Sequence, residues 1–172
     1  MKITTKTGDK GETGLFGGRR VSKASPLVSL LGSLDELQSY TGWARCAFKE
    51  GQVETRATLD RVQDDLYRMM SIVGFSMKVP KNIKEICEQD VEFLEGVIGA
   101  GQEELMDLNK FIRPGTTEEA ARLHVVRAFC RRVEREFVAA VEAGILPGAE
   151  MLLKYLNRLS DAFFVLAYRT LC

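Results

Sequence analysis

Apolar residues recur every three or four positions over most of the chain, which is the spacing of helices that bury one face. The pattern predicts five helices. The first begins at Ser25-Pro26, a pair that suits the N-cap and first helical positions, and it runs to about Phe48, before Gly51. The second ends before Pro80 and carries one apolar seam, formed by Leu59, Val62, Leu66, Met69, Val73 and Met77.

The third and fourth helices differ in how clearly their apolar patterns and ends are marked in the sequence. The third is the weaker, running from about Glu85 to Ile98, and we expect the glycines at 99 and 101 to end it. The fourth opens after Pro114-Gly115 and continues to about Glu142. Its first residues, Thr116-Thr117-Glu118-Glu119, predict a capping box.

The fifth helix follows Pro147-Gly148 and keeps its apolar residues on one seam. Those residues are Leu152, Leu156, Leu159, Phe163 and Leu166. Alternation with period two is predicted only for a short extended stretch near residues 1–5. Seams that persist over five or six turns indicate an all-α protein, an up-and-down five-helix bundle over residues 25–172.

The bulk composition limits the classes of function. With 172 residues the chain is long enough for one domain with a sizeable core, so we expect a single domain over residues 1–172. The formal net charge is zero, which argues against non-specific binding to nucleic acid or to acidic membranes. Four widely spaced cysteines fit reduced thiols better than disulfides or zinc ligands. The sequence has neither a signal peptide nor a long apolar run, so we expect a cytoplasmic protein.

The predicted fourth helix is rich in arginine, with four arginines among the fifteen residues 123–137. At about 100° per residue, Arg127, Arg131 and Glu134 lie together on one flank of the apolar seam. Guanidinium groups around a carboxylate at the edge of a core suit a polyanion such as a triphosphate. A salt-bridged surface helix is the alternative. The single histidine, His124, is expected on the helix surface.

Residues 3–23 do not fit the bundle, because five glycines fall within eleven positions among threonines and cations. Glycine lets backbone amides approach an anion closely and adopts positive φ, as in phosphate-binding nests. Asp9 and Glu12 could hold Mg²⁺ beside phosphates. The segment is not a Walker A loop, because no G-K-[ST] follows its glycines. It predicts a nucleotide-binding loop over residues 1–24, with a flexible glycine-rich tail as the alternative.

The fifth and first helices carry further candidate groups. Asn157 and Asp161 are four residues apart and share one helix face beside the apolar seam. The fourth and fifth helices could therefore present polar flanks to one site, or these residues could form an ordinary polar edge. Asp35 lies among leucines of the first helix, where it could pair with an arginine across a helix or subunit contact, or be a solvated charge.

Six blocks of sequence together resemble the trimeric, five-helix-bundle type of ATP:cob(I)alamin adenosyltransferase. They are T-K-T-G-D-K-G-E-T-G-L at 5–15, V-S-K at 21–23, G-S-L-D-E-L at 32–37, F-I-R-P-G at 111–115, R-A-F-C-R-R-V-E-R at 127–135 and Y-L-N-R-L-S-D at 155–161. Six blocks in the family's order are far more specific than any one of them. The resemblance implies a homotrimer, with ATP between the N-terminal loop of one subunit and the arginine-rich helix of its neighbour.

The resemblance also implies roles for individual residues. The implied nucleotide-site residues are Thr5, Lys6, Thr7, Gly8, Thr13, Gly14, Lys23, Arg131, Arg132, Val133, Glu134, Arg135 and Asn157. The implied catalytic residues are Arg131, Asp161, Arg127 and Asp35, of which the last two pair across the subunit interface. Phe111 matches an aromatic residue that lines the corrinoid side and helps to keep the lower axial position of cobalt empty.

The implied reaction is attack of cob(I)alamin on C5′ of ATP, which gives adenosylcobalamin and triphosphate. Co(I) is itself a strong nucleophile, so the protein's tasks are positioning, stabilising the departing triphosphate and favouring cobalt reduction. Mg²⁺ is expected mainly on the ATP phosphates, with Glu134 as a candidate ligand. A flavin-dependent reductase and an adenosylcobalamin-dependent mutase are the implied partners. The alternative function is a non-catalytic ATP-binding trimer that acts as a sensor or cobalamin carrier.

Three features depart from the family's usual pattern. Arg113 stands where relatives usually have an aliphatic residue on the corrinoid side, and Tyr168 precedes Arg169 where arginine commonly follows L-A directly. The sequence also stops at Cys172, which is shorter than in many relatives. We expect these departures to affect the corrinoid contacts, while the nucleotide-site residues are all retained.

Overall fold

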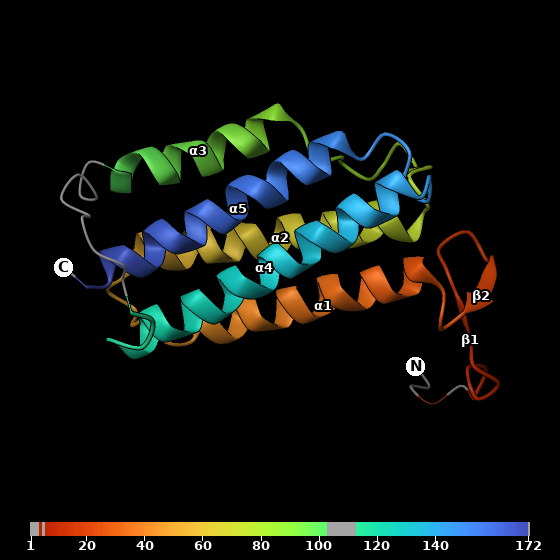
Figure 1. Cartoon of the computed structure of the whole chain (residues 1–172), viewed down its shortest axis with the longest axis horizontal. Helices are drawn as coiled ribbons and strands as arrows, with labels where there is room; N and C mark the ends of the chain where they lie inside the picture. The colour runs from red at the N-terminus through yellow and green to blue at the C-terminus, as the bar shows by residue number, and fades with distance from the viewer. Residues whose placement is uncertain (1–3, 5, 103–112, 172) are drawn as a thin grey trace.

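A computed structural model of the chain describes residue 4 and residues 6–102 and 113–171. The elements of this part, in chain order, are β1 (Glu12–Gly14), β2 (Arg20–Ser22), α1 (Pro26–Arg45), α2 (Val53–Gly74), α3 (Glu88–Gln102), α4 (Glu118–Glu142) and α5 (Glu150–Arg169). The five predicted helices are confirmed. Successive helices run in opposite directions along the long axis, which also confirms the up-and-down arrangement (Figure 1).

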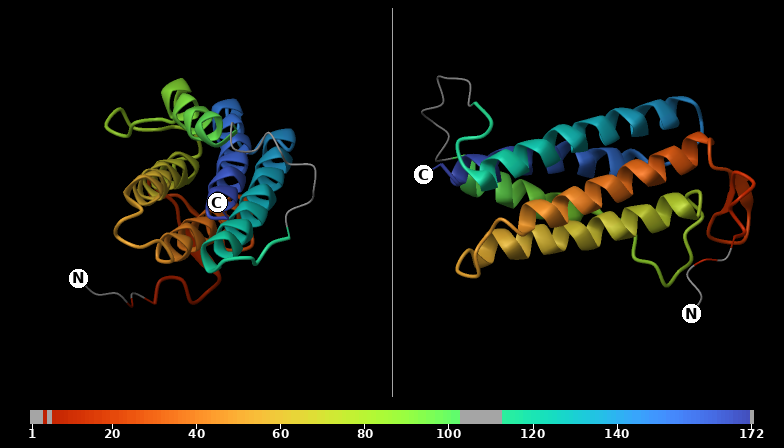
Figure 2. Two further views of the ribbon diagram at one scale, coloured as in Figure 1. Left: turned by 90° about the vertical axis from the view of Figure 1, so that its left-hand side faces the viewer. Right: turned by 90° about the horizontal axis from the view of Figure 1, so that it is seen from below.

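The helices pack around a common interior. α1 contacts α2 and α4, and α5 contacts α4 and α3. Seen end-on, α3 lies over α5 at the side of the bundle opposite α1 (Figure 2). The β1–β2 hairpin projects from the end of the bundle at which α1 begins (Figure 1). The N-terminal hairpin therefore lies outside the bundle to which α4 and α5 belong.

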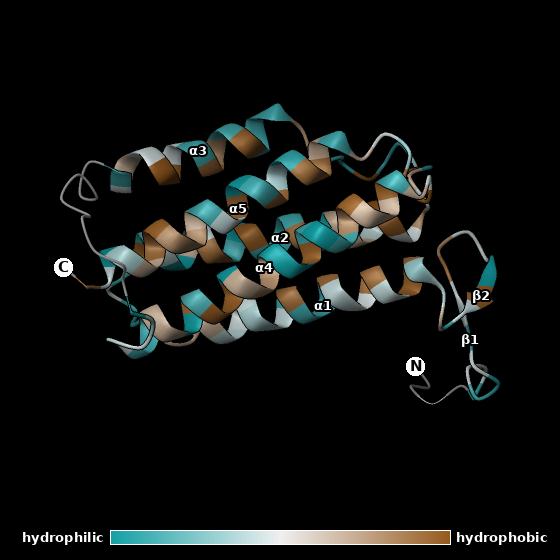
Figure 3. Ribbon diagram, in the orientation of Figure 1, coloured by the Kyte–Doolittle hydropathy of each residue, from teal (hydrophilic) through white to brown (hydrophobic). Residues whose placement is uncertain are grey.

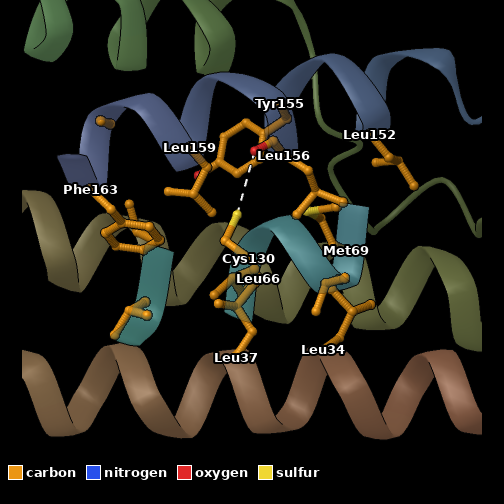
Figure 4. Packing of buried hydrophobic residues seen from close by; sticks show 14 of the residues in the cluster. Leu34, Leu37, Leu66, Met69, Cys130, Leu152, Tyr155, Leu156, Leu159 and Phe163 are labelled. Carbon is orange, nitrogen blue, oxygen red and sulfur yellow. Dashed lines mark hydrogen bonds between the residues drawn. The ribbon is translucent and has the colours of Figure 1, made fainter. Parts of the chain in front are cut away.

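The apolar seams of the helices meet in one core. Its fully buried members include Leu34, Leu37, Leu66, Met69, Leu94, Leu123, Phe137, Tyr155 and Phe163. Figure 4 shows these seams face to face, with Cys130 of α4 between the leucines of α1 and α2 and those of α5. Polar residues cover the outer faces of the helices (Figure 3). Each large buried side chain contributes about 1.5–3 kcal/mol, so packing rather than helix propensity holds the bundle together.

Two helix starts follow from local side-chain chemistry. The Ser25 hydroxyl accepts a hydrogen bond from the amide of Val28 at 3.4 Å, and Pro26 occupies the first helical position, as predicted. The Thr117 hydroxyl accepts one from the amide of Ala120 at 3.0 Å and caps α4. The predicted capping box is therefore wrong in its second half, because the third residue after this N-cap is an alanine, which cannot return the bond.

The prediction that the glycines at 99 and 101 end α3 is wrong. The helix continues through both expected stop positions to Gln102. A Cβ added at Gly101 would lie 2.1 Å from Cγ1 of Val165, so the glycine allows α3 to approach α5 closely. In contrast, α2 ends at Gly74, earlier than its apolar seam predicts, and the chain turns at Ser76 and Met77, where φ is 51° and 66°.

The N-terminal segment also differs from the prediction. β1 and β2 form an antiparallel pair in which Thr13 lies opposite Val21. The alternation test missed them because each strand has only three residues. Residues 1–3 and 5 of the expected extended stretch lie outside the described residues. Within the described part of the chain, no helix is long and apolar enough to cross a membrane.

Candidate functional site

The polar flanks of α4 and α5 meet, as the helical periodicity predicted. Asn157 of α5 donates a hydrogen bond from Nδ2 to Oε1 of Glu134 on α4 at 2.9 Å. Oδ1 of Asn157 accepts in turn from Nη1 of Arg158 at 2.7 Å. Arg158 also pairs with Glu95 of α3 at 2.9 Å. A short polar network thus fixes Glu134 and Asn157 side by side at the edge of the core.

A buried thiol shows that the other charged residues of this flank lie nearby. Cys130 is fully buried and donates from Sγ to the backbone oxygen of Leu156 at 3.4 Å (Figure 4). Burial raises the pKa of the Cys130 thiol, and the Glu134 and Asp161 carboxylates raise it further while Arg131 opposes them. Charged residues of both α4 and α5 therefore act on this thiol. We call Arg127, Arg131, Glu134, Asn157 and Asp161 the α4–α5 polar flank.

The predicted catalytic charges have no ion-pair partners within the described part of a single chain. Arg131, Asp161 and Asp35 are exposed and Arg127 is half-buried, and no salt bridge joins any of them to a described residue. Neighbouring charges behave differently: Arg132 pairs with Glu36 at 2.9 Å. A half-buried guanidinium without a counter-charge is costly, so Arg127 favours an acidic partner from outside the chain.

The other predicted residues of α4 have distinct positions. The Arg132 guanidinium lies over the Phe129 ring at 3.9 Å. The exposed Arg135 donates from Nη1 to the backbone oxygen of Arg131 at 3.1 Å. Val133 is fully buried in the core, so its side chain does not face a surface site in this chain. Only its backbone could contact a nucleotide there.

The N-terminal loop is held together by its own hydrogen bonds. Arg20 donates from Nη2 to the backbone oxygen of Thr7 at 2.8 Å and pairs through Nε with Glu12 at 3.2 Å. The amide of Lys23 donates to the backbone oxygen of Gly11 at 2.9 Å. These bonds bring together the two ends of the loop, which are separated in the sequence.

Glycine and lysine meet within this loop. A Cβ added at Gly8 would lie 3.1 Å from Nζ of Lys23, so the ammonium group lies directly over the glycine. Gly11 has a φ of 80°, in the region that glycine favours, and Lys6 has a φ of 60°. The predicted loop residues from Lys6 to Lys23 are thus gathered at one end of the bundle. Thr5 lies outside the described residues.

The hairpin is anchored to the end of α2. The Phe16 ring stacks on Phe75 with centroids 5.0 Å apart, and a Cβ added at Gly74 would lie 2.5 Å from the Phe16 ring. Arg131 lies near the middle of α4, whereas the hairpin lies beyond the bundle's end (Figure 1). The hairpin and the middle of α4 therefore lie at different places along the bundle.

An exposed aromatic face accompanies the unpaired aspartate on α1. The Tyr40 ring packs at a tilt against Phe129 of α4 with centroids 4.7 Å apart, and the Arg122 guanidinium lies over Trp43 at 4.6 Å. Trp43 is nevertheless 45% exposed. We call Tyr40, Trp43 and Phe129 the aromatic face. Tyr40 and Trp43 both remain exposed on α1, and exposed large aromatic side chains are typical of an interface with another protein surface.

One residue was placed wrongly by the sequence. His124, expected on the helix surface, is only 5% exposed. It lies outside the α4 seam, but Phe164 of α5 covers it, with ring centroids 6.1 Å apart. Its Nδ1 accepts a hydrogen bond from Nε of Arg127 at 3.4 Å. A helical wheel of α4 alone could not reveal this burial, because the covering residue comes from another helix.

The structure contains a buried charge network that the sequence did not predict. Asp65 of α2 and Asp90 of α3 are both nearly inaccessible, and Arg68 forms salt bridges with both of them. Tyr155 of α5 donates its hydroxyl hydrogen to Asp65 at 2.8 Å. Burial raises the pKa of the Tyr155 phenol, and the Asp65 carboxylate raises it further. The network joins α2, α3 and α5 and has a structural role.

The sequence connects three positions with the corrinoid, namely Phe111, Arg113 and Tyr168. Phe111 lies outside the described residues, so its predicted role remains a prediction. Arg113 is exposed, and Tyr168 is half-buried in the last turn of α5, which ends at the opposite end of the bundle from the hairpin (Figure 1). The cavity of about 480 Å³ between α2, α3 and α5 is lined by none of the predicted site residues.

The fold and the α4–α5 polar flank define a helix bundle suited to binding a polyanion. The profile of the cobalamin adenosyltransferase family matches residues 3–170. The corrinoid adenosyltransferase of Bacillus subtilis is 40% identical over 171 residues, which cover 97% of this chain and 85% of the relative. The chain therefore belongs to the cobalamin adenosyltransferase family, as its sequence blocks indicated.

Solved structures agree with this assignment. A variant PduO-type ATP:corrinoid adenosyltransferase from Lactobacillus reuteri, complexed with cobalamin and ATP, is similar to the chain with a TM-score of 0.85 and 31% identity. The match covers 96% of this chain and 91% of that one. Another variant from the same organism, complexed with ATP, gives a TM-score of 0.86 at 30% identity, with coverage of 98% and 93%.

Proposed function

We propose that the protein transfers the 5′-deoxyadenosyl group of ATP to cob(I)alamin, giving adenosylcobalamin and triphosphate. Family membership supports this activity, and so do the structures of similar proteins that bind ATP and cobalamin. The structural observation that carries the proposal is the α4–α5 polar flank. It combines two arginines that lack ion pairs in the described chain with a fixed carboxylate and amide, a suitable set for a nucleoside triphosphate.

The proposed site lies between subunits of a homotrimer. The hairpin projects beyond the end of the bundle whereas Arg131 lies near the middle of α4, so we infer that a complete site takes the loop from one subunit and the flank from its neighbour. The exposed aromatic face and the unpaired Asp35 on α1 support such an interface. In this arrangement Asp35 meets Arg127 of the adjacent subunit, and each unpaired charge gains its partner.

The nucleotide-binding role falls on two groups of residues. From the loop, which is part of the single domain that we propose over residues 1–172, they are Thr5, Lys6, Thr7, Gly8, Thr13, Gly14 and Lys23. From the helices they are Arg131, Arg132, Val133, Glu134, Arg135 and Asn157. Cationic and amide donors bind phosphates in both groups, and Val133 contributes its backbone.

Chemistry at this site needs positioning more than proton transfer. The cobalt centre of cob(I)alamin attacks C5′, the bond from C5′ to the triphosphate oxygen breaks, and the triphosphate leaves with the bonding electrons. Arg131 stabilises the charge that develops on that oxygen, and Asp161 orients the groups around it. Phe111 lines the corrinoid side. This assignment explains why the described site offers unpaired cations.

Mg²⁺ fits this site as an ion carried by the nucleotide. In the described residues, no group of three or more histidine, cysteine, aspartate or glutamate side chains could hold a metal ion. Glu134 uses one carboxylate oxygen to accept from Asn157, which leaves the other for an ion on the phosphates. A cytoplasmic location, a flavin-dependent reductase as electron donor and an adenosylcobalamin-dependent mutase as recipient complete the proposal.

The activity is tested by mixing the protein with MgATP and chemically reduced cobalamin without oxygen. The visible spectrum should change to that of adenosylcobalamin, and triphosphate should appear in equal amount. A folded sample that binds ATP but gives no adenosylcobalamin would overturn the enzyme assignment. That outcome would favour a sensor or cobalamin carrier instead.

A further inference from the structure

The buried histidine of α4 has one satisfied nitrogen and one unsatisfied nitrogen. Nδ1 of His124 accepts the hydrogen bond from Nε of Arg127, one helical turn further on. Nε2 is buried and has no hydrogen-bond partner among the residues that the structure describes. The residue is only 5% exposed, and the Phe164 ring of α5 lies beside its own ring. Among the described residues, the bond to Arg127 is thus the one hydrogen bond that the His124 ring forms.

The geometry fixes the protonation state of this histidine. An imidazole that accepts at Nδ1 carries its single proton on Nε2 and is neutral. Burial lowers the pKa of His124, and the positive charge of Arg127 lowers it further, so both favour the neutral form. Arg127 is therefore held by an acceptor that brings no charge. Its full positive charge remains available to a carboxylate or a phosphate.

Stability alone does not account for a histidine at this position. A buried N–H group without a partner costs about 1–3 kcal/mol, and an apolar side chain of similar volume would avoid that cost. The position is enclosed and its neighbour on α5 is aromatic, so leucine would suit the packing. The hydrogen bond to Arg127 is what histidine provides and leucine cannot.

We propose that His124 is a positioning residue that orients Arg127 for its role at the subunit interface. Because Nε of Arg127 is held inside the chain, its two Nη groups are left for a bidentate partner outside it. Removal of the acceptor frees the long side chain among several rotamers and lowers the fraction that is correctly placed. This inference rests on the proposed function of Arg127.

Three substitutions of one residue separate positioning from packing. His124→Leu removes the acceptor and should lower kcat by about 10- to 100-fold, while the melting temperature stays the same or rises. His124→Asn places an amide oxygen near the Nδ1 position and should keep about a third or more of the activity. His124→Gln is the matched control, because its polar atoms lie nearer the Nε2 position, and it should resemble His124→Leu.

A double-mutant cycle shows whether the effect passes through the arginine. Lysine lacks the Nε donor, so His124→Leu should cause less than about a twofold further loss of kcat in an Arg127→Lys background. An equal loss in both backgrounds would overturn the inference, as would full activity of His124→Leu. An asparagine variant as poor as the leucine variant would also contradict it. If the wild-type protein makes no adenosylcobalamin, it is the proposed function that fails.

Discussion

Replacing Asp35 by alanine should weaken the proposed trimer, because it removes a carboxylate that forms no ion pair within the described part of a single chain. Asp35 is exposed and Arg127 is half-buried, and neither forms an ion pair within the described residues. A hydrogen-bonded pair of this kind across an interface is worth about 1.5–3 kcal/mol. A closed trimer contains three equivalent contacts, so complete dissociation should become easier by about 5–9 kcal/mol. That is a change of about four to six powers of ten in the dissociation constant.

Sedimentation velocity over a dilution series measures this change. Asp35→Ala should dissociate at concentrations at which the wild-type protein remains a trimer. Asp64→Ala is the matched control, because it removes another exposed aspartate without a described ion pair, on α2, which contributes no residue to the aromatic face. The reversed pair, Asp35→Arg with Arg127→Asp, should regain much of the assembly. An Asp35→Ala protein that dissociates no more easily than the wild type would refute the reasoning.

Three further changes test separate parts of the structure. Arg131→Ala should lower turnover by about 100-fold or more while light scattering still reports a trimer; dissociation would instead assign this arginine a structural role. Asp90→Asn should cost about 3–5 kcal/mol of unfolding free energy at pH 7, measured with urea. Burial alone would raise the pKa of Asp90, but hydrogen bonds from Arg68 and Cys87 outweigh it and hold the pKa well below 3.8. That stabilisation is present above about pH 4 and is lost as the pH falls further. The variant should therefore lose less unfolding free energy on acidification than the wild type. An equal loss in the two proteins would exclude Asp90 as the cause. Phe16→Ala should raise KM for ATP several-fold with a smaller effect on kcat, because the loop loses its stack on Phe75; an unchanged KM would separate the hairpin's anchor from nucleotide binding.

The helices were predictable because each has a continuous apolar seam. In α4 and α5 the same periodicity also placed Glu134 and Asn157 on facing flanks, and their 2.9 Å hydrogen bond confirms that they meet. Capping chemistry located the start of α1, because Ser25 and Pro26 act within one turn. Features that depend on the spacing of residues within one helix are therefore accessible from the sequence.

Features that depend on a second helix were not accessible in the same way. Gly101 appeared to be a helix terminator because its role is to make room for Val165, 64 positions later in the sequence. His124 appeared exposed because its cover comes from Phe164. The Asp65–Arg68–Asp90 network needs three helices to bury it. The proposed intersubunit site would add a further level, since its halves would lie on different chains and no pattern within one chain brings them together.

Subunit complementation tests the shared site most directly. Lys23→Ala removes a loop cation and Arg131→Ala removes a flank cation, so each variant alone should be nearly inactive. If every site takes its loop from one subunit and its flank from the next, trimers reassembled from an equal mixture should restore about a quarter of the wild-type sites. The account predicts this recovery of adenosylcobalamin formation. A mixture of confirmed mixed trimers that stays as inactive as its two components would contradict it.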